Sequence, residues 1–248
     1  MEFKDKTIIV TGAASGMGLD AAQAFAKEGA NVVLTDVNSE AVEAAADKIK
    51  KEGGSAVGIQ VDVRDYSQVK GAAERTLKEF GHIDIMVNCA GGSAGRVLKC
   101  PPGEEFHQHD IKVIDWGIDV NLKGPVYFAH AVLGTMMEQK SGVIISLGSC
   151  DGVGGSRAVE YSAAKSGVIG MTKSLAVYGA PHNVRACCIS PGPVLTRPAM
   201  AKLKTRLGRA AQPEEITKMI LYLASEDAKS ITGVNYIIDG GRTVGLLE

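Results

Sequence analysis

Residues 7–22 read TIIVTGAASGMGLDAA, and this stretch joins a β-branched apolar run to a helical pattern through a glycine-rich turn. The glycines at positions 12, 16 and 18 follow a G-x-x-x-G-x-G spacing. Glycines between a strand and a helix permit a tight turn and close backbone approach, and the helix N-terminus stabilises a phosphate group. The stretch therefore predicts a cradle for the pyrophosphate of a dinucleotide, formed by Gly12, Ser15, Gly16, Met17 and Gly18. The alternative is a tight strand-to-helix connection without a ligand.

The next predicted strand, residues 31–36, ends in a carboxylate, Asp36, 18 residues after Gly18. A carboxylate at this point accepts hydrogen bonds from the adenosine ribose hydroxyls and repels a 2′-phosphate. The alternative is that Asp36 is a turn residue ahead of Asn38. NADP-binding sites place Arg or Lys near this ribose, but residues 13–15 are Ala, Ala and Ser, and residue 37 is Val. NAD is therefore favoured over NADP.

Apolar runs alternate with helical patterns along the rest of the chain. The predicted strands are residues 7–11, 31–36, 55–63, 83–91, 143–149, 184–190 and 235–241; the predicted helices include 18–29, 39–53 (capped by Ser39), 67–81 and 213–226. Apolar strands separated by helices indicate an α/β fold: a single-domain, doubly wound parallel sheet, Rossmann-like, with helices on both faces, over residues 1–248. Two long connections, 92–110 and 193–212, follow strands and are expected to border the ligand crevice as substrate loops.

Charge and composition exclude several classes of function. The net charge is −1 and no run of five or more like charges occurs, which argues against a nucleic-acid partner. No apolar stretch reaches about 18 residues, so no membrane span is predicted. The five cysteines form no CxxC pair, which favours free thiols in a reducing cytoplasm over disulfides or a zinc site. We expect a cytoplasmic protein with a small-molecule partner and no metal.

Four further motifs occur in order along the chain. They are VNCAG at 87–91, DVN at 119–121, YSAAK at 161–165 and SPGPVLT at 190–196. Together with the glycine-rich turn, they resemble the motif set of the classical short-chain dehydrogenase/reductase (SDR) family, and the resemblance covers essentially the whole chain. Cys89 stands where the family usually has a second Asn, but Asn88 remains.

The resemblance implies a catalytic set of Asn121, Ser149, Tyr161 and Lys165. Tyr161 would exchange a proton with the substrate, Ser149 would hydrogen-bond the substrate oxygen, and Asn121 would anchor a water molecule that links Lys165 to solvent. A phenol has an ordinary pKa of about 10, so it needs a nearby positive charge to act as a base near neutral pH. Lys165, one helical turn after Tyr161, and an oxidised nicotinamide would supply that charge. Ser146 is the alternative to Ser149.

The resemblance also implies a larger set of cofactor contacts. They are Asp62, Val63, Asn88, Ala90, Gly91, Tyr161, Lys165, Pro191, Gly192, Val194 and Thr196. For Asp62, which would contact the adenine, the alternative is a role as a helix cap.

Other residues receive less specific interpretations. His107, His109 and Asp110 are expected to be solvated and not to bind a metal. Asp151, Arg157 and Glu160 are expected to be surface charges, with contact to substrate as the alternative, because their loop borders the pocket. The helically spaced Ile111, Ile114, Trp116 and Ile118 are expected to be core or subunit contacts.

The sequence thus predicts an NAD-dependent oxidoreductase that interconverts a secondary alcohol and a ketone. The basic segment after Thr196 favours a small polar, hydroxylated or anionic substrate over a bulky apolar one. The enzymatic alternative is an NADPH-dependent reductase of 3-oxoacyl-carrier-protein or steroid-type ketones. The non-enzymatic alternative is a nucleotide-sensing regulatory protein. The resemblance also implies a homotetramer.

Overall fold

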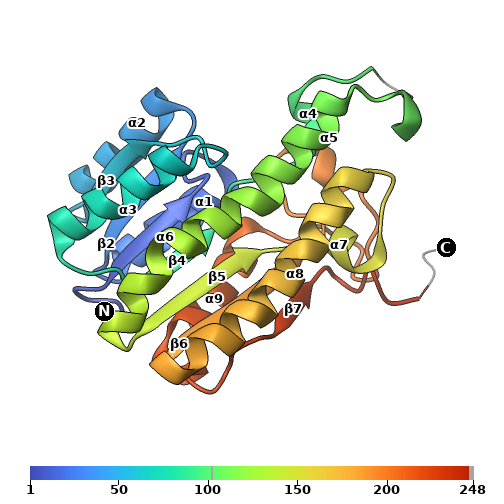
Figure 1. Cartoon of the computed structure of the whole chain (residues 1–248). Coiled ribbons are helices and arrows are strands. Elements are labelled where there is room, and N and C mark those ends of the chain that lie inside the picture. Colours follow the sequence, from blue (N-terminus) through green and yellow to red (C-terminus); the bar gives the residue numbers. More distant parts are fainter. Residues whose placement is uncertain (102, 246–248) are drawn as a thin grey trace.

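The computed structural model describes residues 1–101 and 103–245, and their strands form one seven-stranded parallel sheet in the order β3-β2-β1-β4-β5-β6-β7 (Figure 1). The strands are β1 Thr7–Thr11, β2 Asn31–Asp36, β3 Ser55–Gln60, β4 Ile85–Asn88, β5 Gly142–Leu147, β6 Val184–Pro191 and β7 Asn235–Ile238. Each neighbouring pair runs parallel, so every connection crosses over the sheet. The prediction of a doubly wound parallel sheet is confirmed.

Helices cover both faces of this sheet. The helices are α1 Gly16–Lys27, α2 Ser39–Lys51, α3 Tyr66–Phe80, α4 Ala94–Val97, α5 Ile111–Ile118, α6 Gly124–Gln139, α7 Cys150–Gly154, α8 Val159–Gly179 and α9 Pro213–Ala224. Helices α3, α6 and α8 cover one face, and α1, α2 and α9 cover the other (Figure 1). None of the described helices has both the length and the apolar composition required to cross a membrane.

Two apolar layers hold the helices to the sheet. Successive residues of β1 point to opposite faces, so Ile8 and Val10 join the core under α1 and α9, whereas Ile9 joins the core under α3 and α6. Phe25 of α1 and Phe128 of α6 are both fully buried. Truncating either ring to alanine should cost about 3–5 kcal/mol of stability, so the sheet is a rigid base for the groups at its edge.

The predicted end of strand β3 and the predicted cap of helix α2 are both wrong. The strand predicted over 55–63 ends at Gln60, because Val61, Asp62 and Val63 leave the sheet and line a cavity instead. Helix α2 is capped by Asn38 and not by Ser39: the Asn38 side chain accepts a hydrogen bond from the Ala41 N–H, while the Ser39 hydroxyl donates to Glu43.

The carboxyl ends of the strands open toward the two long connections. Strand order reverses around β1 and β4, and in such sheets this reversal creates a ligand crevice. The connection 92–110 contains α4 and a 3₁₀ turn at Phe106–Gln108, and its residue 102 lies outside the described residues. The connection 193–212 contains a 3₁₀ turn at Pro198–Lys202. Residues 246–248 of the predicted domain also lie outside the described chain.

Candidate active site

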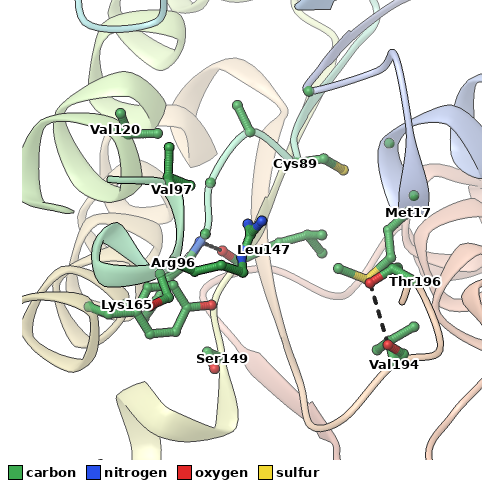
Figure 2. Close-up of a pocket in the computed structure, with 18 of the residues that line it drawn as sticks. Met17, Cys89, Arg96, Val97, Val120, Leu147, Ser149, Lys165, Val194 and Thr196 are labelled. Atoms are coloured by element: carbon green, nitrogen blue, oxygen red, sulfur yellow. Dashed lines mark hydrogen bonds between the residues drawn. The ribbon is translucent and has the colours of Figure 1, made fainter. Parts of the chain in front are cut away.

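A cavity of about 840 Å³ opens at the carboxyl ends of the strands. The glycine-rich turn lines one end of it, and Tyr161, Lys165 and Ser149 line the other. Figure 2 shows Lys165 and Ser149 on one side of the pocket and Met17 and Thr196 on the opposite side. The structure therefore brings the two predicted halves of the site, separated widely in sequence, to a single cavity.

The turn after β1 is held against the end of β4. Gly12 has a φ of 62°, and a Cβ added to it would lie 2.8 Å from the Ala90 Cα, so a side chain would push the two strand ends apart. The Thr11 hydroxyl accepts hydrogen bonds from the N–H groups of Cys89 and Ala90, each at 3.0 Å. The sequence around Thr11 does not predict this role, because a buried threonine at a strand end carries no local signal of it.

The N-terminus of α1 faces the cavity and fits a phosphate group. The Ser15 side chain accepts no hydrogen bond from the first turn of the helix, although it occupies the N-cap position. The first N–H groups of a helix have no partner within the helix, and its dipole favours negative charge there. The turn can thus hold the pyrophosphate that the sequence predicts.

Asp36 lies at the same end of the cavity, with its carboxylate fixed by two backbone groups. Its Oδ2 accepts a hydrogen bond from the Ala14 N–H and its Oδ1 from the Asn38 N–H, both at 3.1 Å. Each carboxylate oxygen retains a second lone pair for a ribose hydroxyl. Val37 beside it is 62% exposed. A dinucleotide fits this end because the turn, the helix N-terminus and Asp36 lie in the order that phosphate and ribose require.

Asp62 lines the cavity near Asp36 but is paired with an arginine that the sequence analysis overlooked. Arg64 donates from Nε and Nη2 to the two carboxylate oxygens, with Nη2 2.6 Å from Oδ2. This bidentate hydrogen bonding lowers the pKa of the Asp62 carboxyl. The helix-cap alternative is wrong, because Asp65 caps α3 by accepting from the Ser67 N–H.

At the opposite end, Tyr161 and Lys165 project from adjacent turns of α8. Ser149, at the N-cap of α7, is 8% exposed, and its Oγ accepts a hydrogen bond from the Asp151 N–H at 3.1 Å. Ser146 does not line the cavity; its hydroxyl accepts a hydrogen bond from the buried Asn88 amide. Ser149 is therefore the serine beside Tyr161, as the sequence analysis preferred.

Burial dominates the electrostatics of this end. It raises the pKa of Tyr161, and Asp151 and Cys150 add to the increase, while hydrogen bonding with Ser149 and the charge of Arg197 oppose it. Burial also lowers the pKa of Lys165 from 10.5 to about 8. The Lys165 ammonium donates to the Leu147 carbonyl at 2.7 Å and lies 5.8 Å from the centre of the Tyr161 ring. Burial thus outweighs the groups that lower the Tyr161 pKa, and the expectation that Lys165 and an oxidised nicotinamide together lower it stays a prediction.

Asn121 is fully buried in a π-helical turn, Asp119–Lys123, between α5 and α6. Its Nδ2 donates to the carbonyls of Gly92 and Gly117, both at 2.9 Å, and its Oδ1 accepts from the Gly92 N–H at 2.8 Å. The water molecule expected at Asn121 stays a prediction; the hydrogen-bonding groups of its side chain hold Gly92 in place. Asn121 is not among the residues that line the cavity.

Most of the predicted cofactor residues line the cavity. They are Gly12, Ser15, Gly16, Met17, Gly18, Asp36, Asp62, Val63, Ala90, Gly91, Tyr161, Lys165, Gly192, Val194 and Thr196. Asn88 and Pro191 are buried at the ends of β4 and β6 and do not line it. The cavity is also lined by Arg64, Arg96, Val120, Met200, Leu203 and Arg242, which the sequence does not single out, and by Trp116, which was expected to be a core or subunit contact. These residues come from loops and helix faces whose approach to the cavity depends on tertiary packing.

The remaining candidates have structural partners or unexpected burial. Asp110 caps α5 by accepting from the Lys112 N–H at 2.9 Å. Arg157 donates to both carboxylate oxygens of Glu105, at 2.8 and 3.0 Å, and joins the 92–110 connection to the segment before Tyr161. Glu160, expected at the surface, is 4% exposed because it packs against Gly117 of α5. Within residues 1–101 and 103–245, no three His, Cys, Asp or Glu side chains gather as a metal site would require.

Comparisons with known proteins agree with this geometry. A family model described as enoyl-(acyl carrier protein) reductase matches residues 12–243. D-threitol dehydrogenase of Mycolicibacterium smegmatis is 37% identical over 250 residues, covering 96% of this chain and 93% of that protein. The (2S)-[(R)-hydroxy(phenyl)methyl]succinyl-CoA dehydrogenase subunit BbsD of Thauera aromatica is 33% identical over 256 residues, covering 98% and 99%. The crystal structure of a short-chain type dehydrogenase/reductase from Mycobacterium marinum superposes with a TM-score of 0.90 at 33% identity, covering 98% and 97%.

The sheet, the phosphate-binding turn and the Ser–Tyr–Lys group define an oxidoreductase built around a dinucleotide. The chain belongs to the short-chain dehydrogenase/reductase family, whose members use the nicotinamide cofactors NAD or NADP, and the resemblance seen in the sequence is confirmed.

Proposed function

We propose that this protein is an NAD(H)-dependent oxidoreductase that interconverts a secondary alcohol and a ketone. One observation carries the proposal: Ser149, Tyr161 and Lys165 line the same cavity as Asp36 and the glycine-rich turn. A substrate carbinol next to Tyr161 would therefore lie in the same cavity as a bound dinucleotide. The filled Tyr and Lys positions argue against the alternative of a nucleotide sensor without catalysis.

The protein's own groups handle the proton and the orientation of the substrate. A bound nicotinamide would supply the hydride chemistry. During oxidation the Tyr161 oxygen takes the proton of the substrate hydroxyl, and during reduction it returns that proton to the carbonyl oxygen. The Ser149 hydroxyl donates a hydrogen bond to the same substrate oxygen. Lys165 is mostly protonated at neutral pH, because its pKa is about 8, and its charge stabilises the phenolate form of Tyr161.

Asp36 supports NAD as the coenzyme. Its fixed carboxylate would repel the 2′-phosphate of NADP at the point where a ribose fits. Among the cations that line the cavity, Arg64 is the nearest to Asp36 in sequence. Its guanidinium is already paired with the Asp62 carboxylate through two hydrogen-bonding nitrogens. The competing assignment, an NADPH-dependent 3-oxoacyl-carrier-protein or steroid-type ketone reductase, would need a free cation at this position.

The lining of the substrate end supports a small polar substrate. Arg96, Asp151, Arg197 and Arg242 line it together with the apolar Val97, Trp116, Met200 and Leu203. Four charged groups are more than a site for a steroid or a long acyl chain requires. We place the reaction in the cytoplasm, since the five cysteines are all free, and we propose a homotetramer as the working assembly.

A turnover screen tests the proposed function. The purified protein would be assayed with sugars, polyols, hydroxy acids, steroids and aryl ketones, each with NAD(H) and NADP(H). We expect turnover with NAD(H) on the polar set. Tyr161→Phe should lower kcat by at least about 100-fold while NADH binding stays nearly unchanged, because only the proton-transfer group is lost. Near-normal turnover by a folded Tyr161→Phe protein would rule out the assignment of Tyr161.

A further inference from the structure

We propose that Arg96 and Arg197 form a subsite for a carboxylate group of the substrate, so that the alcohol or ketone is a hydroxy acid or oxo acid. This inference rests on the proposed function and specifies its substrate class. The two arginines come from different parts of the chain: Arg96 from α4 in the 92–110 connection, and Arg197 from the residue before the 3₁₀ turn Pro198–Lys202. Both line the cavity that holds Tyr161.

Neither guanidinium has an anionic partner within residues 1–101 and 103–245. Among the described residues, the ion pairs join other groups, and no side-chain hydrogen bond involves Arg96 or Arg197. Three other arginines differ in this respect. Arg64 is paired with Asp62, Arg157 with Glu105 and Arg209 with Glu215, each through hydrogen bonds to both carboxylate oxygens. Two unpaired guanidinium groups beside one cavity leave positive charge for a ligand to neutralise.

The position of Arg96 relative to the catalytic groups is fixed through Gly92. The φ of Gly92 is 148°, and a Cβ placed there would lie 2.9 Å from the Arg96 Nη2, so the guanidinium lies directly against the Gly92 backbone. Asn121 holds this glycine by the two hydrogen bonds described above. The preceding residue, Gly91, is beside Lys165: a Cβ on Gly91 would lie 3.3 Å from the Lys165 Nζ. Arg96 therefore reaches the cavity close to the catalytic lysine, and Figure 2 shows the two on the same side.

Arg197 lies close enough to Arg96 and to Tyr161 for its charge to interact with both. Its pKa is lowered, first by burial and then by the positive charge of Arg96, while Tyr161 opposes this change. Two cations that repel each other next to the phenol would both be stabilised by a shared anion. The planar guanidinium group suits a carboxylate, which it can bind through two parallel hydrogen bonds.

Other charges at this end fit the same interpretation. Arg242 also lines the cavity, but it donates to the Lys204 carbonyl at 2.7 Å and so is already oriented. Asp151, an acidic residue of this wall, belongs to α7 and not to either substrate loop, and its charge raises the pKa of Tyr161. We therefore expect a substrate carboxylate to lie between the two loops, away from α7, while its carbinol faces Tyr161.

The test compares Arg96→Met and Arg197→Met with wild type, and Arg157→Met is the matched control. Arg157 is a rim arginine that is already paired and does not line the cavity. The substrates are a hydroxy acid found in the turnover screen, its methyl ester and the corresponding hydroxyalkyl phosphate. Hydrogen bonds to a charged group imply that each Arg→Met change raises KM for the acid by about 10- to 100-fold, with kcat changed less than about threefold. KM for the ester and all constants of Arg157→Met should remain near wild-type values.

Two further measurements distinguish a failure of the carboxylate subsite from a failure of the proposed enzymatic function. Titration of each variant with NADH, followed by fluorescence, should give unchanged affinity; a loss equal to the rise in KM would assign the arginines to the cofactor and overturn the proposal. Calorimetry of the NADH-loaded protein with succinate and with neutral succinamide tests the subsite without turnover. Preferential binding of succinate that disappears in both Arg→Met variants supports the subsite even if no alcohol is oxidised. Equal binding of the two probes, or a preference for the phosphate substrate, refutes it.

Discussion

Replacing Lys165 with methionine should change how the stability of the protein depends on pH. Burial lowers the pKa of this lysine from 10.5 to about 8. At about 1.4 kcal/mol per pKa unit, the folded state stabilises the charged form by about 3 kcal/mol less than water does. Methionine has a similar length and no charge, so Lys165→Met removes this cost together with the hydrogen bond to Leu147.

The sign of the effect follows from proton binding. Below about pH 8 the lysine is charged in both the folded and the unfolded wild type, and the folded state bears the full cost. Between about pH 8 and 10.5 the folded protein loses the proton while the unfolded chain keeps it, so the free energy of unfolding rises with pH. The stability of wild type relative to Lys165→Met should therefore increase by about 3 kcal/mol across this window.

Urea denaturation without added coenzyme, followed by circular dichroism at several values between about pH 7 and pH 10, measures this difference. Lys173→Met, which removes an exposed lysine from the same helix, is the control and should show no such trend. The lost bond to Leu147 shifts the whole Lys165→Met curve by a similar amount at every pH. If the stability difference between wild type and Lys165→Met stays constant from about pH 8 to pH 10, burial of the Lys165 charge does not lower the stability of the folded protein.

Three further outcomes are expected. Asp36→Ala should narrow the preference for NAD over NADP, measured as the ratio of kcat/KM values, because it removes the charge facing a 2′-phosphate; a wild type that prefers NADP would contradict this assignment. Asn121→Ala should lower the free energy of unfolding by about 3 kcal/mol, since three buried hydrogen bonds are lost. An unchanged denaturation midpoint would show that other contacts hold Gly92. Light scattering should return a tetramer, with exposed Val126, Val177 and Tyr178 on α6 and α8 as candidate contacts; a monomer at micromolar concentration would exclude it.

Local pattern was sufficient to predict the fold and the outline of the site. Apolar runs located all seven strands, because a strand covered on both faces must be apolar along its length. The glycine-rich turn and the Tyr161–Lys165 spacing also predicted the two ends of one cavity. These features depend on residues near one another in sequence or on one helix face, where spacing determines geometry.

The rest depends on contacts between distant segments. Nothing in the sequence near Arg157 predicts its pairing with Glu105, and nothing near Glu160 predicts that Gly117 allows it to be buried. The pKa of Tyr161 likewise reflects how deeply the ring is buried, an effect that outweighs the hydrogen bond with Ser149 and the charge of Arg197. The sequence also could not predict that Arg96 lacks an anionic partner among the described residues, because that depends on which carboxylates the fold brings near it.

The π-helical turn at Asp119–Lys123 should make this part of the chain sensitive to changes in length. A π turn contains one residue more than an α-helical turn. Deleting one residue there, such as Leu122, would restore a regular helix with little rotation of α5 relative to α6, because the five residues of this π turn cover nearly the same angle as four residues of an α-helix. The change would fall on Asn121 inside the turn, whose amide would no longer be held facing Gly92. Related chains should therefore tolerate substitutions along this helix far better than single-residue insertions or deletions.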